Sequence, residues 1–290
     1  MKTTYPKDFI AVIMSHGRPE FTEKHTYRTL RSHGYTGPIL VLIDNEDKCR
    51  GEYVRIFGED NVAVFDKDEW ASKTDECDNF RHRKAIVYAR NASFSVVASR
   101  GYRYFIQLDD DYNAWRYRRK HSGEFCDKKI HNLDGVMCAM LDYYKSSGAT
   151  SIAFAQSGDF MGGKRCSTVN GWSATRKCMN TWICDVRRPI QYAGHMNEDC
   201  SAYAVHGFRG GLFLQIPFVA ISQVPTQAAA GGMTDTYKAG GTYNKTFYTV
   251  MQVPSCCVVH EMGYNHRRIH HKLIWPNLAP KIIRESVKKK

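Results

Sequence analysis

Three consecutive carboxylates, Asp109, Asp110 and Asp111, directly follow the apolar segment Tyr104 to Leu108. Like charges at the end of a buried strand repel one another, and each desolvated carboxylate is driven toward protonation unless a cation offsets its charge. Carboxylate oxygens suit Mg²⁺ or Mn²⁺, and these ions favour substrates that carry phosphates. The triplet therefore predicts a divalent-metal site that uses Asp109 and Asp111; the alternative is a solvated acidic turn.

Apolar runs alternate with helical patterns in the sequence that leads to this triplet. We expect strands at Phe9 to Met14, Pro38 to Ile43 and Asn61 to Phe65, and helices at Phe21 to Ser32 and Arg81 to Ser99. This rhythm indicates right-handed βαβ units, whose ligands bind at the carboxyl ends of the strands. The pattern predicts an α/β fold with a mostly parallel central sheet, in which the triplet ends a central strand beside the first.

The second half of the chain has a more mixed pattern and no linker, which favours one compound domain. After a helix at Leu133 to Ser146, we expect strands at Ser151 to Ala155, Gly171 to Ala174, Thr181 to Asp185, Gly211 to Ile216, Phe218 to Ser222 and Cys256 to His260, a short helix opening at Asn197-Glu198-Asp199, and a mobile loop at Gln227 to Gly241.

Polar residues near the expected strand ends could bind a phosphorylated ligand. Arg18 follows the first strand, in one loop with Ser15, and Arg83 and Arg90 precede the triplet. These arginines could contact phosphates; the alternative for each is a solvated surface charge. Asp44, at the end of the second strand, could accept hydrogen bonds from a base or ribose.

The net charge of +12 and the pI near 9.2 imply attraction to a polyanion, such as nucleic acid, an anionic membrane or a phosphorylated small molecule. In the segment Trp115 to His121, cations could bind DNA phosphates while Trp115 or Tyr117 stacks on a base. The tail from Lys281 to Lys290 is a second candidate; the alternative is a solvated basic face with a disordered tail. The cations of the first segment are Arg116, Arg118, Arg119 and Lys120.

The class of protein is bounded by its 43% hydrophobic content and its ten cysteines, none in a Cys-x-x-Cys pair. This content supports a substantial core, and the cysteine spacing argues against zinc knuckles and disulfide scaffolds. The segment Met1 to Asp8 is polar, and no apolar run reaches the roughly 18 to 20 residues that span a membrane. We expect no membrane association and a reducing cytoplasm, that of a host cell if a phage encodes the chain.

The order of these motifs resembles the GT-A fold glycosyltransferases. The shared features are a short loop after the first strand, an acidic end to the second strand, the helix segment Ala89-Arg90-Asn91, and a strand that ends in the Asp-x-Asp signature of Asp109 and Asp111. The Ser-His-Gly-Arg-Pro, Leu-Asp-Asp-Asp-Tyr and Asn-Glu-Asp motifs and the basic charge look like the TET/JBP-associated glycosyltransferases of bacteriophages, which are thought to glycosylate hydroxymethylated pyrimidines in DNA.

This resemblance implies a metal-dependent hexosyltransferase that moves a sugar from a nucleotide-sugar, expected to be a UDP-sugar, to 5-hydroxymethylcytosine or a related 5-hydroxymethylpyrimidine in DNA. It implies one domain over 1–290, with a nucleotide-sugar-binding half at 1–115, an acceptor-side half at 116–275 and a basic tail at 276–290.

The resemblance also assigns roles to the acidic residues. Asp109 and Asp110 would contact the nucleotide, Asp111 would ligate Mn²⁺ or Mg²⁺ with Asp109, and Asp199 beside Glu198 would be the general base of an inverting transfer. On sequence alone, Glu198 and Asp199 could instead be a helix start favoured by the dipole. A late histidine often completes the metal shell of GT-A enzymes; His260 is our choice, and its competitors are His266, His270 and His271.

Three other functions fit the same residues. A two-metal nuclease could use the triplet, Asp199 and His260 as ligands, and it would nick DNA without a sugar nucleotide. A non-catalytic DNA-binding module would keep its affinity after loss of the triplet. A glycosyltransferase with a non-DNA acceptor also fits, because the basic charge is the only direct indication of DNA.

Overall fold

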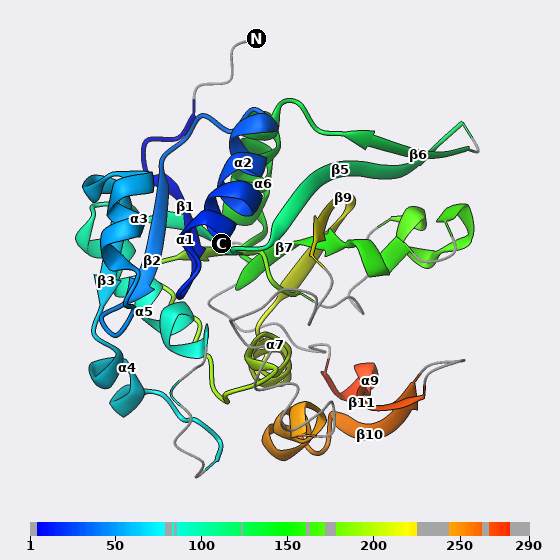
Figure 1. Cartoon of the computed structure of the whole chain (residues 1–290). Coiled ribbons are helices and arrows are strands. Elements are labelled where there is room, and N and C mark those ends of the chain that lie inside the picture. The colour runs from blue at the N-terminus through cyan, green and yellow to red at the C-terminus, as the bar shows by residue number, and fades with distance from the viewer. Residues whose placement is uncertain are drawn as a thin grey trace.

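The computed structural model describes residues 5–78, 83, 86–122, 124–160, 163–171, 178–224, 244–262 and 267–278. A nine-stranded sheet in the order β3-β2-β1-β4-β8-β7-β9-β5-β6 forms its centre (Figure 1). No helix in these ranges is both long and apolar enough to cross a membrane. The predicted strand Gly171 to Ala174, the loop Gln227 to Gly241, His266 and the tail Lys281 to Lys290 lie wholly or mostly outside the described residues.

The first half of the sheet is parallel, as predicted. It comprises β1 (Phe9–Met14), β2 (Ile39–Asp44), β3 (Val62–Phe65) and β4 (Tyr104–Asp109), with β1 between β2 and β4. Every residue of β1 and β2 is buried, which explains their unbroken apolar runs. Because Met14 pairs with Asp109, the loop after β1 and the acidic triplet meet at one edge of the sheet.

Helices follow or precede these strands. The expected helix at Phe21 to Ser32 is three consecutive pieces: α1 (Pro19–Thr22), a π-helical segment (Glu23–Tyr27) and α2 (Arg28–Ser32). The others in this half are α3 (Arg50–Phe57), a 3₁₀ turn (Glu59–Asn61), α4 (Lys67–Lys73) and α5 (Ile86–Ser99). The side chain of Asp66 caps α4 by accepting a hydrogen bond from the Glu69 N–H.

The second half makes the sheet mixed. It contains β5 (Tyr112–His121), β6 (Glu124–Lys129), α6 (Leu133–Ser147), β7 (Ser151–Gln156), β8 (Trp182–Asp185), α7 (Glu198–Phe208) and β9 (Phe213–Gln223), with 3₁₀ turns at Ser157–Phe160, Gly163–Arg165 and Ser167–Asn170. β8 is antiparallel to β4, and β7 is parallel to β9. A helix over 244–252, α9 (Trp275–Leu278) and the separate hairpin of β10 (Cys257–Met262) and β11 (Arg268–Leu273) complete the fold.

The predicted break between strands at Gly211 to Ile216 and Phe218 to Ser222 is wrong, because β9 runs through both. Its register with β7 shifts between Phe154 and Ala155, so Pro217 lies in an irregular stretch of the ladder. A residue without an N–H is tolerated at such a bulge, since no ladder hydrogen bond is lost there.

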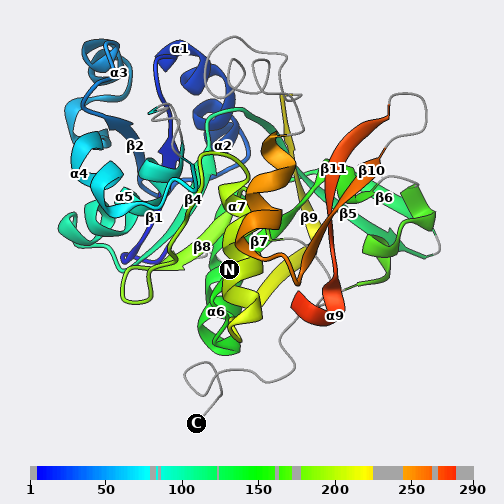
Figure 2. The ribbon, with the colours of Figure 1, turned by 90° about the horizontal axis from the view of Figure 1, so that it is seen from below.

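Two hydrophobic cores cover the two faces of the sheet. Side chains of β1 alternate between them: Phe9, Ala11 and Ile13 join one cluster, and Ile10, Val12 and Met14 the other. The first cluster includes side chains of α2 and α6, and the second includes side chains of α5 and α7. Figure 2 shows α7, the helix over 244–252 and the β10–β11 hairpin gathered on one side of the sheet. This packing brings α7 to the face that α5 also covers.

Candidate functional site

The loop after β1 binds the middle carboxylate of the triplet. Arg18 donates to Asp110 through Nε (2.7 Å to Oδ2) and Nη2 (2.5 Å to Oδ1), and the Ser15 hydroxyl donates to Oδ2 at 2.6 Å. Asp110 is 2% exposed, so these bonds satisfy both of its oxygens in the interior. The structure therefore brings three predicted site residues together, but Ser15 and Arg18 bind Asp110 and not a ligand. Their direct contact with a nucleotide stays a prediction.

Arg90 joins the first carboxylate of the triplet to α7. Its Nη2 donates to Asp109 Oδ1 at 3.0 Å and its Nε donates to Glu198 Oε1 at 2.9 Å. Arg90 is 2% exposed, and burial raises the pKa of Glu198 to about 7 although Arg90 acts to lower it. Burial also raises the pKa of Asp109; Arg90 lowers it, whereas the charge of Asp199 raises it further. This buried arginine thus places the Asp-x-Asp and Asn-Glu-Asp motifs side by side.

Asp111 differs from its two neighbours because no arginine of the described residues pairs with it. Its Oδ1 is buried and has no hydrogen-bond partner among the described residues. Burial, followed by the charges of Asp109 and Asp110, raises the pKa of Asp111 to about 8. A divalent cation would supply to Asp111 what Arg18 supplies to Asp110, and oxygen ligands from Asp109 and Asp111 suit Mn²⁺ or Mg²⁺. The residues present therefore fit the predicted metal.

The pKa of Asp111 predicts an unusual pH dependence for the metal-free protein. The ordinary pKa of this carboxyl group is 3.8 and its folded value is about 8, so between these values the folded state binds more protons than the unfolded state. The free energy of unfolding should therefore fall as pH rises from about 4 to about 8. Asp111→Asn removes the titration, so it should gain stability relative to wild type at pH 8.5 compared with pH 5.

Urea unfolding in a chelator at the two pH values measures this difference. Asp142→Asn, at an exposed position of α6, is the matched control. Saturating Mn²⁺ should reverse the sign at high pH, because the ion binds the deprotonated carboxylate. A stability difference between Asp111→Asn and wild type that does not change with pH would contradict the assignment.

The second acidic motif opens α7. Asn197 has left-handed backbone angles (φ 58°), and its Nδ2 lies 3.0 Å from both Thr249 Oγ1 and His271 Nδ1. His271 is 5% exposed, and its Nε2 lies 3.1 Å from Cys200 Sγ. Asp199, 8% exposed, accepts a hydrogen bond from the Cys200 N–H at 2.7 Å. The helix over 244–252 and the β10–β11 hairpin thereby hold the start of α7 in place.

The predicted metal histidine, His260, lies on β10 opposite His270 and is exposed. In the described part of the chain no hydrogen bond or ion pair joins it to Asp109 or Asp111. Its role as a ligand stays a prediction. The late histidine that contacts the start of α7 is His271. Its Nδ1 faces Asn197 and its Nε2 faces Cys200.

Asp44 ends β2 at the same edge of the sheet. It accepts a hydrogen bond from His16 Nδ1 at 2.6 Å and lies 3.4 Å from Lys67 Nζ. Burial would raise the pKa of Asp44, but the bond to His16 and the charge of Lys67 bring it below its ordinary value. Arg83 pairs with Asp68 and, at 3.2 Å, with Glu46. Asp44 is therefore an ionised acceptor, and the expected phosphate contact of Arg83 stays a prediction.

Of the two residues predicted to stack on a DNA base, Trp115 is too buried to do so, whereas Tyr117 is 37% exposed and its stacking stays a prediction. Trp115 is fully buried and packs edge-on against Phe154, with ring centroids 4.8 Å apart. Arg116 and Arg118 both pair with Asp127 on the adjacent strand β6. Arg119 and Lys120 are exposed near the end of β5. Arg116, Arg118 and Lys120 alternate with Trp115 and so lie on the other face of β5, whereas Arg119 shares the face of Trp115 but lies in the exposed end of the strand.

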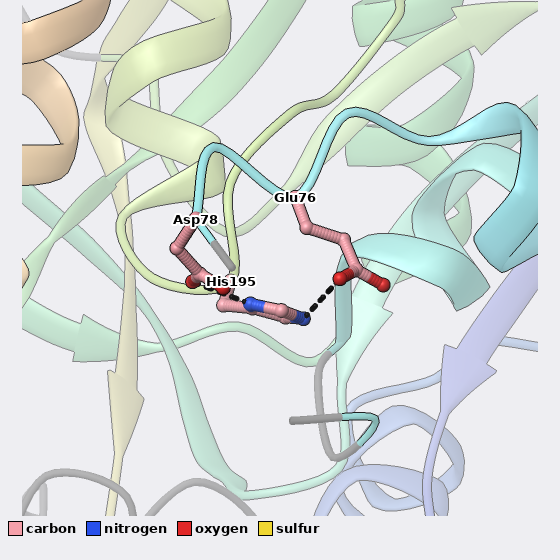
Figure 3. Close-up of side chains that lie close together, drawn as sticks. All are labelled: Glu76, Asp78 and His195. Atoms are coloured by element: carbon pink, nitrogen blue, oxygen red, sulfur yellow. Dashed lines mark hydrogen bonds and ion pairs between the residues drawn. The ribbon is translucent and has the colours of Figure 1, made fainter. Parts of the chain in front are cut away.

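The structure also gathers three residues that the sequence did not single out (Figure 3). His195 Nδ1 lies 2.7 Å from Asp78 Oδ2, and its Nε2 lies 3.7 Å from Glu76 Oε2 and 3.0 Å from the Tyr88 hydroxyl. Their ligand atoms lie within 4.8 Å of one another, a set of types that can hold a metal ion. The two carboxylates face opposite ring nitrogens, so the group ties residues 75–78 to the segment before α7. The acidic run at Asp75 to Asp78 is visible in the sequence, but its histidine partner is not.

Comparison with known proteins adds a family and a fold. The model of a family described as TET-Associated Glycosyltransferase matches residues 9–232, whereas no curated protein matches the chain. The mannosyltransferase PcManGT from Pyrobaculum calidifontis, solved in complex with GDP-Man and Mn²⁺, is similar with a TM-score of 0.51 at 10% identity, over 86% of this chain and 65% of that one. This likeness confirms the predicted GT-A fold.

Two further solved structures are similar at lower scores. S. aureus TarS 1-349 has a TM-score of 0.47 at 8% identity, over 85% of this chain and 65% of that one. Glucosyl-3-phosphoglycerate synthase from Mycobacterium tuberculosis, in complex with Mn²⁺, UDP and phosphoglyceric acid, has a TM-score of 0.47 at 7% identity. The match covers 92% of this chain and 87% of that one. The chain thus spans 65% of the length of PcManGT and of the TarS fragment.

Proposed function

The chain belongs to the TET-associated glycosyltransferase family, and we propose that it transfers a sugar from a nucleotide-sugar to the hydroxymethyl group of a 5-hydroxymethylpyrimidine in DNA. The observation that carries this proposal is the bridge from Arg90 to both Asp109 and Glu198. It supports a site in which the proposed metal-binding pair and the candidate general base lie together at the edge where α/β sheets bind their ligands. A donor diphosphate and an acceptor hydroxyl could therefore meet there.

Asp109 and Asp111 would hold Mn²⁺ or Mg²⁺, which when bound offsets the charge that develops on the diphosphate leaving group. Asp199 would hydrogen-bond the acceptor hydroxyl and take its proton as the new bond to the sugar forms. Arg90 binds Glu198, which precedes Asp199 in the chain, and so fixes the first turn of α7. Arg18 and Ser15 act through Asp110, whose backbone sets the positions of Asp109 and Asp111.

We propose a UDP-sugar as donor and 5-hydroxymethylcytosine as acceptor on the strength of the family resemblance. PcManGT was solved with GDP-Man, so the fold itself accommodates a different base. Asp44 supports binding of a base or ribose, since it is an ionised acceptor at the sheet edge. We also propose a cytoplasmic location, in which the DNA acceptor is present and the ten free cysteines stay reduced.

The acceptor proposal predicts a difference between modified and unmodified DNA. Duplexes carrying 5-hydroxymethylcytosine should gain one hexose per modified base from a suitable sugar nucleotide with Mn²⁺, whereas cytosine duplexes should bind but not react, because they offer no alcohol at the base edge. Intact-mass analysis of the digested nucleosides, with a panel of sugar nucleotides, tests donor and acceptor together. Nicking of a plasmid with metal and no donor would instead support a nuclease.

The β5–β6 hairpin should carry part of the DNA affinity. Arg119→Ala with Lys120→Ala should lower the slope of log K against log salt by about one unit for each phosphate that the variant no longer neutralises. Donor hydrolysis without DNA should be nearly unchanged. Lys24→Ala with Lys272→Ala removes the same charge from other exposed positions and serves as the control. A slope equal to that of the control would show that DNA does not bind at this hairpin.

A further inference from the structure

A basic pocket of about 310 Å³ lies at the edge of the sheet opposite to the acidic triplet. It forms where β4 begins at Tyr104 and where the antiparallel β8 ends at Asp185, and these two residues pair in the ladder. Since β4 runs on from Tyr104 to Asp109, the pocket and the carboxylate site are separated by about 17 Å along the strand. The pocket is therefore distinct from the proposed catalytic site.

The lining of this pocket is strongly unbalanced in charge. One carboxylate, Asp185, faces four cations: Arg103, Lys145, Arg187 and Arg188. Asp185 Oδ2 accepts hydrogen bonds from Arg103 at 3.2 and 3.4 Å, and its Oδ1 accepts the backbone N–H of Arg187 at 2.9 Å. Both carboxylate oxygens are thus engaged, and the pocket keeps a formal charge of +3.

Three of the four cations, Arg103, Lys145 and Arg188, are held by contacts around the pocket. Arg188 donates from Nη2 to the Tyr144 hydroxyl at 2.8 Å and to the Ala149 carbonyl at 3.1 Å. Arg103 and Lys145 both lie over the Tyr104 ring, at 4.8 and 4.4 Å from its centroid. These contacts fix donors around one space before any ligand enters, which lowers the entropy that binding would cost.

Three of the four cations lack an acidic partner among the described residues: Arg188 donates to the Tyr144 hydroxyl and to backbone carbonyls, and the other two make no ion pair. Across the described ranges, no carboxylate lies within ion-pair distance of Lys145 or Arg187, and both side chains are exposed. The C-terminus of α6 accounts for Lys145, because cations are favoured in the last turn of a helix. It does not account for Arg187, which comes from the turn after β8. The convergence of cations from three elements indicates a shared anionic ligand.

We propose that this pocket binds a phosphate group. A phosphate accepts several charge-assisted hydrogen bonds and can offset most of the excess charge. The Tyr104 and Tyr144 rings are already covered by cations, so the pocket recognises the anion and not an aromatic base. The phosphate can belong to a free phosphorylated small molecule or to a nucleic-acid backbone. The proposal does not depend on the proposed sugar transfer.

Calorimetry with inorganic pyrophosphate, in a chelator that suppresses metal-dependent binding at the triplet, tests the small-molecule source. Lys145→Ala with Arg187→Ala should weaken binding at least about tenfold, as expected when one or more charge-assisted hydrogen bonds are removed. These two positions keep the Arg103–Asp185 pair intact. Lys164→Ala with Lys272→Ala removes two exposed charges elsewhere and should retain wild-type affinity.

Fluorescence anisotropy with an unmodified 20-base-pair duplex tests the backbone source on the same variants. A lower salt slope in Lys145→Ala/Arg187→Ala than in Lys164→Ala/Lys272→Ala, with pyrophosphate binding absent even in wild type, assigns the pocket to DNA. Loss of pyrophosphate affinity alone assigns it to a free phosphate. If the pocket variant matches the control in both measurements, the proposal is overturned. Sugar transfer is assayed separately, so an absence of sugar transfer does not change the conclusion from these two binding measurements.

Discussion

Replacing Asp111 with alanine is expected to lower sugar transfer by at least about 10³-fold while the fold survives. In the described part of the chain Asp111 is the one member of the triplet without an arginine partner, so its loss leaves the charge on the diphosphate without its proposed counterion. The fold should persist because Asp111 lies after the end of β4 and its Oδ1 makes no hydrogen bond within the described residues. Radiolabelled transfer and circular dichroism measure the two effects.

Excess chelator should lower sugar transfer by wild-type protein to the level of Asp111→Ala. The control variant Asp142→Ala should transfer sugar normally. Calorimetry should show that Asp111→Ala no longer binds Mn²⁺ at the triplet. Near-normal transfer by Asp111→Ala, or by wild type in excess chelator, would show that the reaction does not use a metal at this position.

Asp199→Asn should separate donor binding from chemistry. An amide has nearly the same shape as the carboxylate but cannot take the acceptor proton, so turnover should fall by on the order of 10²-fold to 10⁴-fold with donor affinity retained. The bond from the Cys200 N–H to Asp199 Oδ1 can be kept by the amide oxygen, so α7 should not shift. Donor titration by calorimetry and single-turnover transfer give the two quantities.

Glu198→Gln is the informative comparison for this variant, because Glu198 accepts a hydrogen bond from Arg90 and is not the proposed base. The Glu198→Gln variant should keep most of the wild-type turnover. A loss of donor affinity in Asp199→Asn with normal turnover per bound donor would make Asp199 a donor ligand instead of the base.

The parallel half of the fold could be predicted because each of its strands is buried on both faces. Phe9 to Met14 is an unbroken apolar run, and the structure gives β1 these same limits. The triplet could be placed beside β1 for the same reason. The face of β5 could not be predicted, because aromatic and basic residues alternate there. The pairing of β5 with β9, and the hydrogen bond from the Trp115 backbone N–H to His33, hold Trp115 in the interior.

Interactions between distant segments were also beyond sequence reasoning. Nothing in the spacing of Arg18 and Asp110 indicates that they bond to each other and not to a ligand. Likewise, His195 meets Glu76 and Asp78 only because the segment before α7 returns to the loop after α4. Residue types showed which side chains could do chemistry, but the packing of loops decides which are already engaged.

The strand order has a consequence for how the chain folds during its synthesis. β4 and β5 are consecutive in sequence, yet β8, β7 and β9 lie between them in the sheet. At ribosomal rates, roughly ten seconds pass between the synthesis of Asp109 and that of Gln223. Within this interval β4 has an open edge until β8 is made, and the β5–β6 hairpin lacks its neighbouring strand until β9 is made. Because the strand that covers this edge comes later, the proposed donor-binding half should be vulnerable to edge-to-edge aggregation on the ribosome until β8 has emerged.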